Sequence, residues 1–216
     1  MNKIIQSKFP RTAKQKVANL PHKSKAQSLV EFAITLPILL LLLSGVVEFG
    51  FALNYYLSLL DATREAARYY SNADPFNADS SDNMDFYANT AALARANLDP
   101  YLANPSYQGR RIFLDPSADD VIVTVYAKSE TEVLSYPTSG VYHMYNNSTS
   151  MFTSELIQSR FENGSPNAGI LLVEVDYNYH QVMKLPWLAP FVPDPILLKA
   201  YTIMPLASAE PIAVQP

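Results

Sequence analysis

The sequence predicts an α+β protein in which a long N-terminal helix packs on a small antiparallel sheet. An apolar run that begins at Phe32 passes without a turn signal into an amphipathic stretch that reaches Ser71. Later segments alternate apolar and polar residues, as strands with one buried face do. The helix and the sheet would each lack a complete apolar core alone, so we expect them to pack together.

Charge divides the chain into a basic leader, residues 1–26, and an acidic remainder. The leader has seven basic residues and no acidic one, whereas the remainder has 9 basic and 20 acidic residues, a formal charge of −11. Basic residues flank the cytoplasmic side of membrane spans, so we expect a cytoplasmic leader and an extracytoplasmic C-terminal part. A basic arm can also bind nucleic acid. Beside an apolar span we expect membrane lipid as the partner, and no nucleic acid.

Residues 27–71 are predicted to form a transmembrane helix that continues as an amphipathic helix. Sixteen uncharged residues separate Glu31 from Glu48, and apolar character extends to Leu60, which suffices for the ~20 residues that cross the hydrocarbon layer. A cleaved secretory signal has a shorter apolar core and a small-x-small site soon after it. We therefore favour a retained span, which Pro37 is expected to kink because it removes a backbone donor.

The outer half of this helix is predicted to turn one apolar stripe toward the rest of the protein. Glu65 and Arg68 form an i,i+3 pair on the opposite, polar face. The helix is expected to end before Asp74-Pro75, because proline disfavours helical geometry at the preceding residue. The stripe has three- and four-residue spacing and consists of Leu53, Tyr56, Leu57, Leu60, Ala67 and Tyr70.

Residues 72–216 are expected to form one extracytoplasmic α+β domain. Strict alternation over residues 171–180 predicts a strand with one buried and one solvent-exposed face. Residues 136–169 are predicted to be mainly loop. The other expected elements are a helix over 86–98, strands over 121–126 and 197–204, a short strand over 112–114, and a helical turn over 154–161.

Four short motifs between residues 27 and 68 carry a resemblance to a known family. They are Gln27-Ser28-Leu29-Val30-Glu31-Phe32-Ala33, Leu36-Pro37, Glu48-Phe49-Gly50 and Ala62-Thr63-Arg64-Glu65-Ala66-Ala67-Arg68. Their order resembles that of the TadE-like family, pseudopilin-like proteins of the tight-adherence (Tad) pilus. The resemblance implies a pilin-like fold and a single-pass protein of the bacterial inner membrane that acts in assembly of a Tad-type pilus or secretion apparatus. The partners that it implies are a prepilin peptidase, other pilin-like subunits and the Tad inner-membrane machinery.

The resemblance also implies processing by a prepilin peptidase between Ala26 and Gln27. Glu31 would then be the fifth residue of the mature chain, and a carboxylate at the membrane is costly unless it is paired. The new α-amino group of Gln27 on a neighbouring subunit would be its partner in assembly. Such peptidases prefer glycine before the cut, where this chain has alanine. The alternative is an uncleaved anchor in which Glu31 extends to the inner interface.

Two further features are candidate sites. Glu48 lies ~25 Å along the helix from Glu31 and is expected to be an intramembrane polar residue. We favour a carboxylate at the outer interface over a polar contact between helices. The apolar segment 185–193, with Trp187 and Phe191, either contacts the membrane or a partner or packs over one end of the sheet, and we favour the packing.

No catalytic, metal or cofactor site is predicted. The chain has no cysteine, which excludes disulfides and thiol nucleophiles. His143 and His180 are isolated in the sequence, and Asp115, Asp119 and Asp120 are interpreted as a solvated turn in preference to a cation site. We therefore expect an assembly protein and not an enzyme. The alternative is an uncleaved, signal-anchored extracytoplasmic binding or scaffold domain.

Overall fold

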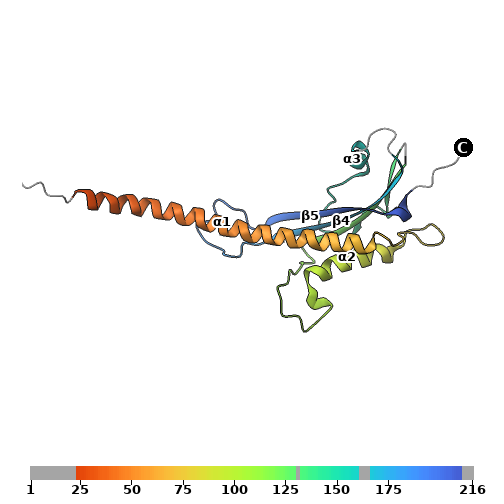
Figure 1. Ribbon diagram of the computed structural model, residues 1–216, viewed down its shortest axis with the longest axis horizontal. Helices are drawn as coiled ribbons and strands as arrows, with labels where there is room; N and C mark the ends of the chain where they lie inside the picture. Colours follow the sequence, from red (N-terminus) through yellow and green to blue (C-terminus); the bar gives the residue numbers. More distant parts are fainter. Residues whose placement is uncertain (1–22, 130–131, 161–165, 211–216) are drawn as a thin grey trace, which may run out of the picture. The chain divides into compact units, whose positions relative to one another are not determined.

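The computed structural model describes residues 23–129, 132–160 and 166–210, so most of the predicted leader lies outside the described residues. The predicted fold class is confirmed, since a long N-terminal helix precedes a small antiparallel sheet (Figure 1). The elements are α1 (Lys23–Tyr70), α2 (Met84–Leu98), η1 (Pro100–Leu102), β1 (Asp120–Lys128), β2 (Val133–Tyr136), β3 (Tyr142–His143), α3 (Ser154–Ser159), β4 (Ala168–Tyr179), β5 (Ile196–Pro205) and η2 (Ala207–Ala209).

The chain divides after Leu43 into two compact units. Of the first unit, the structure describes residues 23–43, which all belong to α1. The side chains from Gln27 to Leu40 are exposed, although most of them are apolar. Within the described residues, α1 is the one helix that is long and apolar enough to cross a membrane. The chain stays helical on both sides of Pro37.

The second unit, from Ser44 onward, contains the sheet. Its strand order is β2-β1-β4-β5, and the short β3 also pairs with β1. Every pairing is antiparallel, and the register places Val173 opposite both Val123 and Thr202. The expected strand near 197–204 is confirmed as β5, which lies at one end of this order and ends at Pro205. A proline is tolerated there because the outer side of an edge strand has no ladder to break.

One face of the sheet is covered by the outer part of α1 together with α2 (Figure 1). Leu59, Ala62 and Ala66 of α1 are almost completely buried in the same core as Val123 and Val173. The two alanines leave space for the backbones of helix and sheet to approach, and such close packing is typical of protein interiors. This core fixes the outer part of α1 on the globular domain.

The predicted apolar stripe on α1 is partly wrong. Leu53 and Leu57 are 45% and 48% exposed, while Tyr56, Leu60 and Tyr70 pack partly against the core and Ala67 is buried. The line of most buried residues runs instead through Glu48, Leu59, Ala62, Thr63 and Ala66. The hydrophobic pattern predicted that Leu53 and Leu57 would face the sheet. The sheet instead packs on the helix face that carries the small side chains of Ala62 and Ala66.

The prediction of a solvent-exposed face on the strand at 171–180 is also wrong. Residues of β1 and of most of β4 are buried on both faces. The second face carries Tyr126, Ile170 and Leu172, and these side chains pack with Phe152 and Ile157. The segment that was predicted to be mainly loop therefore covers the sheet. Its expected helical turn is present as α3, and Phe161 lies outside the described residues.

The helix predicted over 86–98 is confirmed as α2, which begins after its N-cap residue Asn83 and is followed by Asp99. The short strand predicted over 112–114 is wrong. Ile112 and Leu114 are buried, but they lie in an irregular segment whose Ile112 N–H donates to the Leu98 carbonyl at 2.8 Å. Side-chain burial produced the alternation here without any strand pairing.

Candidate functional site

The predicted processing segment lies at the start of the described chain. Ala26 and Gln27 belong to the first turn and a half of α1. The side-chain amide of Gln27 donates to the Glu31 carboxylate at 3.0 Å, one turn further along. The carbonyl of Glu31 accepts from the Thr35 hydroxyl at 2.7 Å. The structure thus brings Gln27 and Glu31 together through an exposed contact between neighbouring turns of the helix.

The residues next to Glu31 in the sequence are apolar and exposed. Leu29, Val30 and Phe32 are 69%, 59% and 61% exposed. A carboxylate among exposed apolar groups is costly to bury without a charged partner. This part of the helix therefore presents an apolar surface with one acidic group.

Glu48 occupies a different environment, inside the second unit. Its carboxylate is 3% exposed, and it accepts three hydrogen bonds, from the Tyr179 hydroxyl at 2.6 Å and from the backbone N–H groups of Val182 and Met183 at 2.8 and 3.1 Å. Burial together with the hydrogen bond to Glu48 raises the pKa of Tyr179. The carboxylate therefore fixes the end of β4 and the start of the following loop on α1.

The sequence did not indicate these partners of Glu48, because they lie more than 130 positions later in the chain. The only signal was the placement of Tyr179 at the end of the best alternating segment. A tyrosine at that point has a hydroxyl that needs a partner once its ring is buried.

Trp187 and Phe191 lie in the loop between β4 and β5. The indole N–H of Trp187 donates to the Ser44 hydroxyl of α1 at 3.2 Å, and the tryptophan is 49% exposed. Leu188 is buried, whereas Phe191 is 70% exposed. The side-chain amide of Gln181 donates to the Val192 carbonyl at 3.0 Å across the loop. The loop is therefore anchored on the fold and still presents an exposed aromatic ring.

The two histidines that are isolated in sequence have carboxylate partners in the fold. The imidazole of His180 lies 2.8 Å from Asp194, across the base of this same loop. The imidazole of His143 lies 2.9 Å from the buried carboxylate of Asp120. Each contact joins residues from different strands or loops, so it stabilises the tertiary structure.

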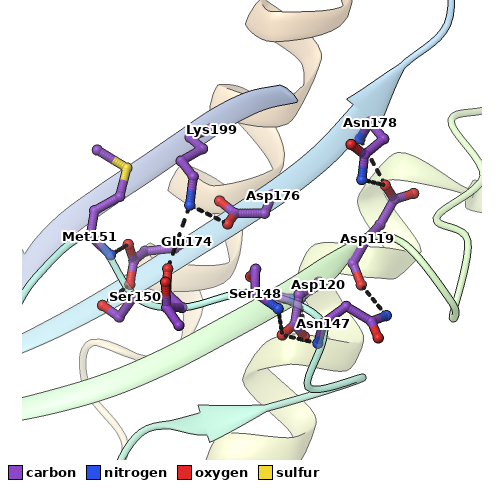
Figure 2. Close-up of polar contacts among 12 residues, drawn as sticks. Asp119, Asp120, Asn147, Ser148, Ser150, Met151, Glu174, Asp176, Asn178 and Lys199 are labelled. Carbon is purple, nitrogen blue, oxygen red and sulfur yellow. Dashed lines mark hydrogen bonds and ion pairs between the residues drawn. The ribbon is translucent and has the colours of Figure 1, made fainter. Parts of the chain in front are cut away.

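Figure 2 shows a network of buried acidic side chains at the sheet, which the sequence did not indicate. The interpretation of Asp119 and Asp120 as part of a solvated turn is wrong, because both are almost fully buried. Asp120 accepts from the backbone N–H groups of Tyr145 and Asn147 at 3.0 and 3.1 Å. Asp119 accepts from the Asn178 N–H at 2.7 Å. Burial raises the pKa of Asp119.

The same network continues along β4 and β5. Figure 2 shows Lys199 directed toward Asp176, with which it forms an ion pair. The Glu174 carboxylate accepts from the Ser150 hydroxyl and from the Met151 N–H. Burial raises the pKa of Glu174. Glu174, like Asp120, therefore bonds to the covering segment, whereas Asp176 joins β4 to β5 through Lys199.

Within the described residues, no group of three or more histidine and acidic side chains could hold a metal ion. The buried carboxylates instead accept hydrogen bonds from nearby backbone N–H groups. Such carboxylates satisfy the donors of the loops that they organise. The network therefore has a clear structural function.

Comparison with known protein families gives a match over part of α1. Residues 26–68 match the family model described as TadE-like protein, as the sequence motifs predicted. No curated protein and no solved structure matches the chain. The matched residues contain the predicted processing segment, Glu31, Glu48 and the buried residues of α1 that contact the sheet.

Proposed function

We propose that this chain is a pilin-like membrane protein that acts in the assembly of a Tad-type pilus or secretion apparatus. The observation that carries the proposal is the TadE-like match over residues 26–68. That match covers the apolar helix, which is long enough to cross a membrane. In this proposal the leader is cytoplasmic, the span is in the bacterial inner membrane and the α+β domain is extracytoplasmic.

The proposed assembly step depends on Glu31. In the uncut chain its carboxylate accepts from the neutral amide of Gln27. Cleavage after Ala26 would create a charged α-amino group on Gln27, and a charge-assisted hydrogen bond is about twice as strong as a neutral one. The amine of a neighbouring subunit would therefore replace the amide, while the exposed apolar residues around Glu31 pack between helices. The partners are a prepilin peptidase, other pilin-like subunits, the Tad inner-membrane machinery and lipid.

The proposal assigns the globular domain a structural role and no enzymatic one. Its buried carboxylates are used by the fold, as the contacts of Glu48, Asp120 and Glu174 illustrate. The second candidate function is an uncleaved, signal-anchored scaffold domain. The residue before the proposed cut favours it, because this chain has Ala26 where the peptidases prefer glycine.

Measuring the N-terminus of the membrane-extracted protein tests the proposal. Mass spectrometry of protein from cells with an active prepilin peptidase should find Gln27 as the first residue. Ala26→Gly should be cut at least as completely, whereas Ala26→Phe should remain uncut because a bulky ring obstructs the peptidase. An N-terminus at Met1 in the wild-type protein would favour the uncleaved scaffold.

The role of Glu31 needs a separate assay. Glu31→Ala should be cut normally but should fail to crosslink to other subunits in intact cells. Glu65→Ala is the matched control, since Glu65 is an exposed glutamate on the same helix that pairs with Arg68. Equal crosslinking by both variants would contradict the proposed pairing of Glu31 with an α-amine.

A further inference from the structure

We propose that a cavity beside the outer part of α1 binds the headgroup of an anionic phospholipid, with Arg110 as the ligand of its phosphate. The cavity has a volume of about 570 Å³ and is lined by Val47, Gly50, Phe51, Asn54, Tyr55, Arg110 and Val182. This inference rests on the membrane span in the proposed function, but it requires neither cleavage nor assembly.

Arg110 supplies the positive charge of the cavity. It is exposed, and its guanidinium lies 4.3 Å from the centroid of the Tyr55 ring. Within the part of the chain that the structure describes, no carboxylate forms an ion pair with it. A guanidinium that stacks on an aromatic ring keeps its N–H groups available in the plane, where they match a phosphate.

The surrounding structure holds this guanidinium in place. The Tyr55 ring stacks on Tyr177 of β4 with centroids 5.9 Å apart. The next residue, Arg111, forms an ion pair with Asp99 at 2.5 Å, and Ile112 is buried and bonded to the end of α2. The backbone on the C-terminal side of Arg110 is thus fixed, so the arginine is positioned before any ligand arrives. A ligand then loses less free energy to ordering.

Apart from Arg110, Asn54 and the Tyr55 hydroxyl, the walls of the cavity are apolar. Val47 and Phe51 are 39% and 40% exposed, and Val182 is 49% exposed. A Cβ atom added at Gly50 would meet nothing within 4 Å, so this glycine leaves open space. The nearby carboxylate of Glu48 is buried and bonded to Tyr179 and the loop, and it does not line the cavity. A lipid could place its anionic headgroup against the Arg110 cation and its hydrocarbon chain against the apolar side chains.

The position along the helix identifies a membrane lipid as the occupant. The exposed apolar residues of α1 continue through Val46, Phe49 and Leu53, and the polar Asn54 follows. In the proposed topology this is where hydrocarbon gives way to the headgroup layer. Tryptophan and tyrosine are enriched at both membrane interfaces, and arginine is among the residues that anchor a helix there. The half-exposed Trp187 is bonded to the same helix at Ser44.

Lipid titration of the purified full chain, followed by native mass spectrometry, tests the proposal. Dioleoylphosphatidylglycerol should bind more tightly than dioleoylphosphatidylcholine, and inorganic phosphate should not displace it. Arg110→Gln should weaken phosphatidylglycerol binding by about tenfold or more, because it removes a hydrogen bond to a charged group. Gly50→Leu should weaken binding at least as much, because its side chain fills the cavity while Arg110 remains.

Two control variants make this test specific. Arg160→Gln removes another arginine that stacks on an aromatic ring, at 5.4 Å from Phe152, and does not touch the cavity. Gly45→Leu places a leucine on α1 at another glycine with open space, again away from the cavity. Both should bind phosphatidylglycerol like the wild-type protein, and circular dichroism should show that all four variants are folded.

Several outcomes would overturn the lipid site. If Arg110→Gln binds phosphatidylglycerol as tightly as the wild-type protein, Arg110 does not bind the phosphate. If Gly50→Leu binds it unchanged, the lipid does not occupy this cavity. Equal binding of phosphatidylcholine would refute an anionic headgroup, and displacement by inorganic phosphate would identify a free-anion site. Release of the wild-type protein from membranes by alkaline carbonate would instead refute the proposed span. Failure of the lipid site and failure of the proposed membrane span therefore give different results.

Discussion

At the scale of single residues, buried carboxylates join segments that are distant in the sequence. Glu48 connects α1 to the end of β4, and Asp120 connects β1 to the segment that covers the sheet. Each carboxylate accepts several hydrogen bonds, and this offsets the cost of removing it from water. Removing one of them should leave several donors unpaired at once.

The first residue-scale prediction concerns Glu48. Glu48→Ala would leave the Tyr179 hydroxyl and two backbone N–H groups without their acceptor. We expect the free energy of unfolding to fall by about 2–4 kcal/mol, since each buried unpaired donor costs on the order of 1–3 kcal/mol. Urea unfolding of the detergent-solubilised full chain measures it. Glu65→Ala, at an exposed pair, should change it by less than about 1 kcal/mol, and equal losses would refute the role of Glu48.

The second residue-scale prediction concerns pH. Burial raises the pKa of Glu174 in the folded state, so the folded protein binds this proton more readily than the unfolded chain. The ionised group therefore costs stability at neutral pH, and that cost disappears as pH falls through the raised pKa. Glu174→Gln should be more stable relative to the wild type at pH 8 than at pH 4.5. Thermal unfolding at both values measures this difference.

Asp99 provides a control with the opposite sign. The hydrogen bonds from Arg111 lower the pKa of Asp99, so its stabilisation is present at neutral pH and is lost as pH falls through the lowered pKa. Asp99→Asn should therefore be most destabilised, relative to the wild type, at neutral pH. The same sign of change in both variants would contradict the assignment for Glu174.

At the scale of elements, the outer part of α1 is part of the core of the globular unit. Its buried face is defined by Leu59, Ala62 and Ala66, which pack with the central strands. Thr63 adds a buried hydrogen bond to Thr202 of β5 at 2.9 Å. The sheet therefore depends on the helix for one of its two covering layers.

A pair of leucines two positions apart tests which face of α1 is buried. Leu59 has no exposed surface, whereas Leu57 is 48% exposed. Leu59→Ala should lower the free energy of unfolding by about 2–5 kcal/mol, because it removes buried methyl groups and leaves a cavity. Leu57→Ala should change it by no more than about 0.5 kcal/mol. Denaturant titration of the two variants compares them directly, and a larger loss for Leu57→Ala would reverse the assigned face.

At the scale of the whole molecule, charge and hydrophobicity are separated along the chain. The basic residues before the span and the −11 balance of residues 27–216 predict a cytoplasmic leader and an extracytoplasmic domain. The absence of cysteine makes this orientation easy to test, since one introduced thiol is the only site for a maleimide.

Single-cysteine variants measure the orientation. In spheroplasts of cells without prepilin peptidase, Ser106→Cys should react with a membrane-impermeant maleimide, since Ser106 is exposed on the globular unit. Ser7→Cys, in the leader, should react only after the membrane is permeabilised. Labelling of Ser7→Cys alone in intact spheroplasts would show the reverse orientation.

The sequence determined the long apolar helix, its end near residue 70, the second helix and the three main strands. These features depend on local properties, namely the length of the apolar run, periodicity, and prolines that end an element. The same linear pattern predicted the TadE-like match and the positions of Ala26, Gln27 and Glu31. Whether these three residues act in processing stays a prediction that the N-terminal measurement tests.

Tertiary structure alone decided which face of α1 is buried, which segment covers the second face of the sheet, and what Glu48 and Arg110 contact. Hydrophobic spacing is compatible with more than one rotation of a helix, and here the sheet packs on Leu59, Ala62 and Ala66, while Leu53 and Leu57 stay exposed. The partners of Glu48 and Arg110 come from residues that are far apart in the chain. Only the packing of strands and loops brings them within hydrogen-bonding or stacking distance, and a linear pattern carries no record of those distances.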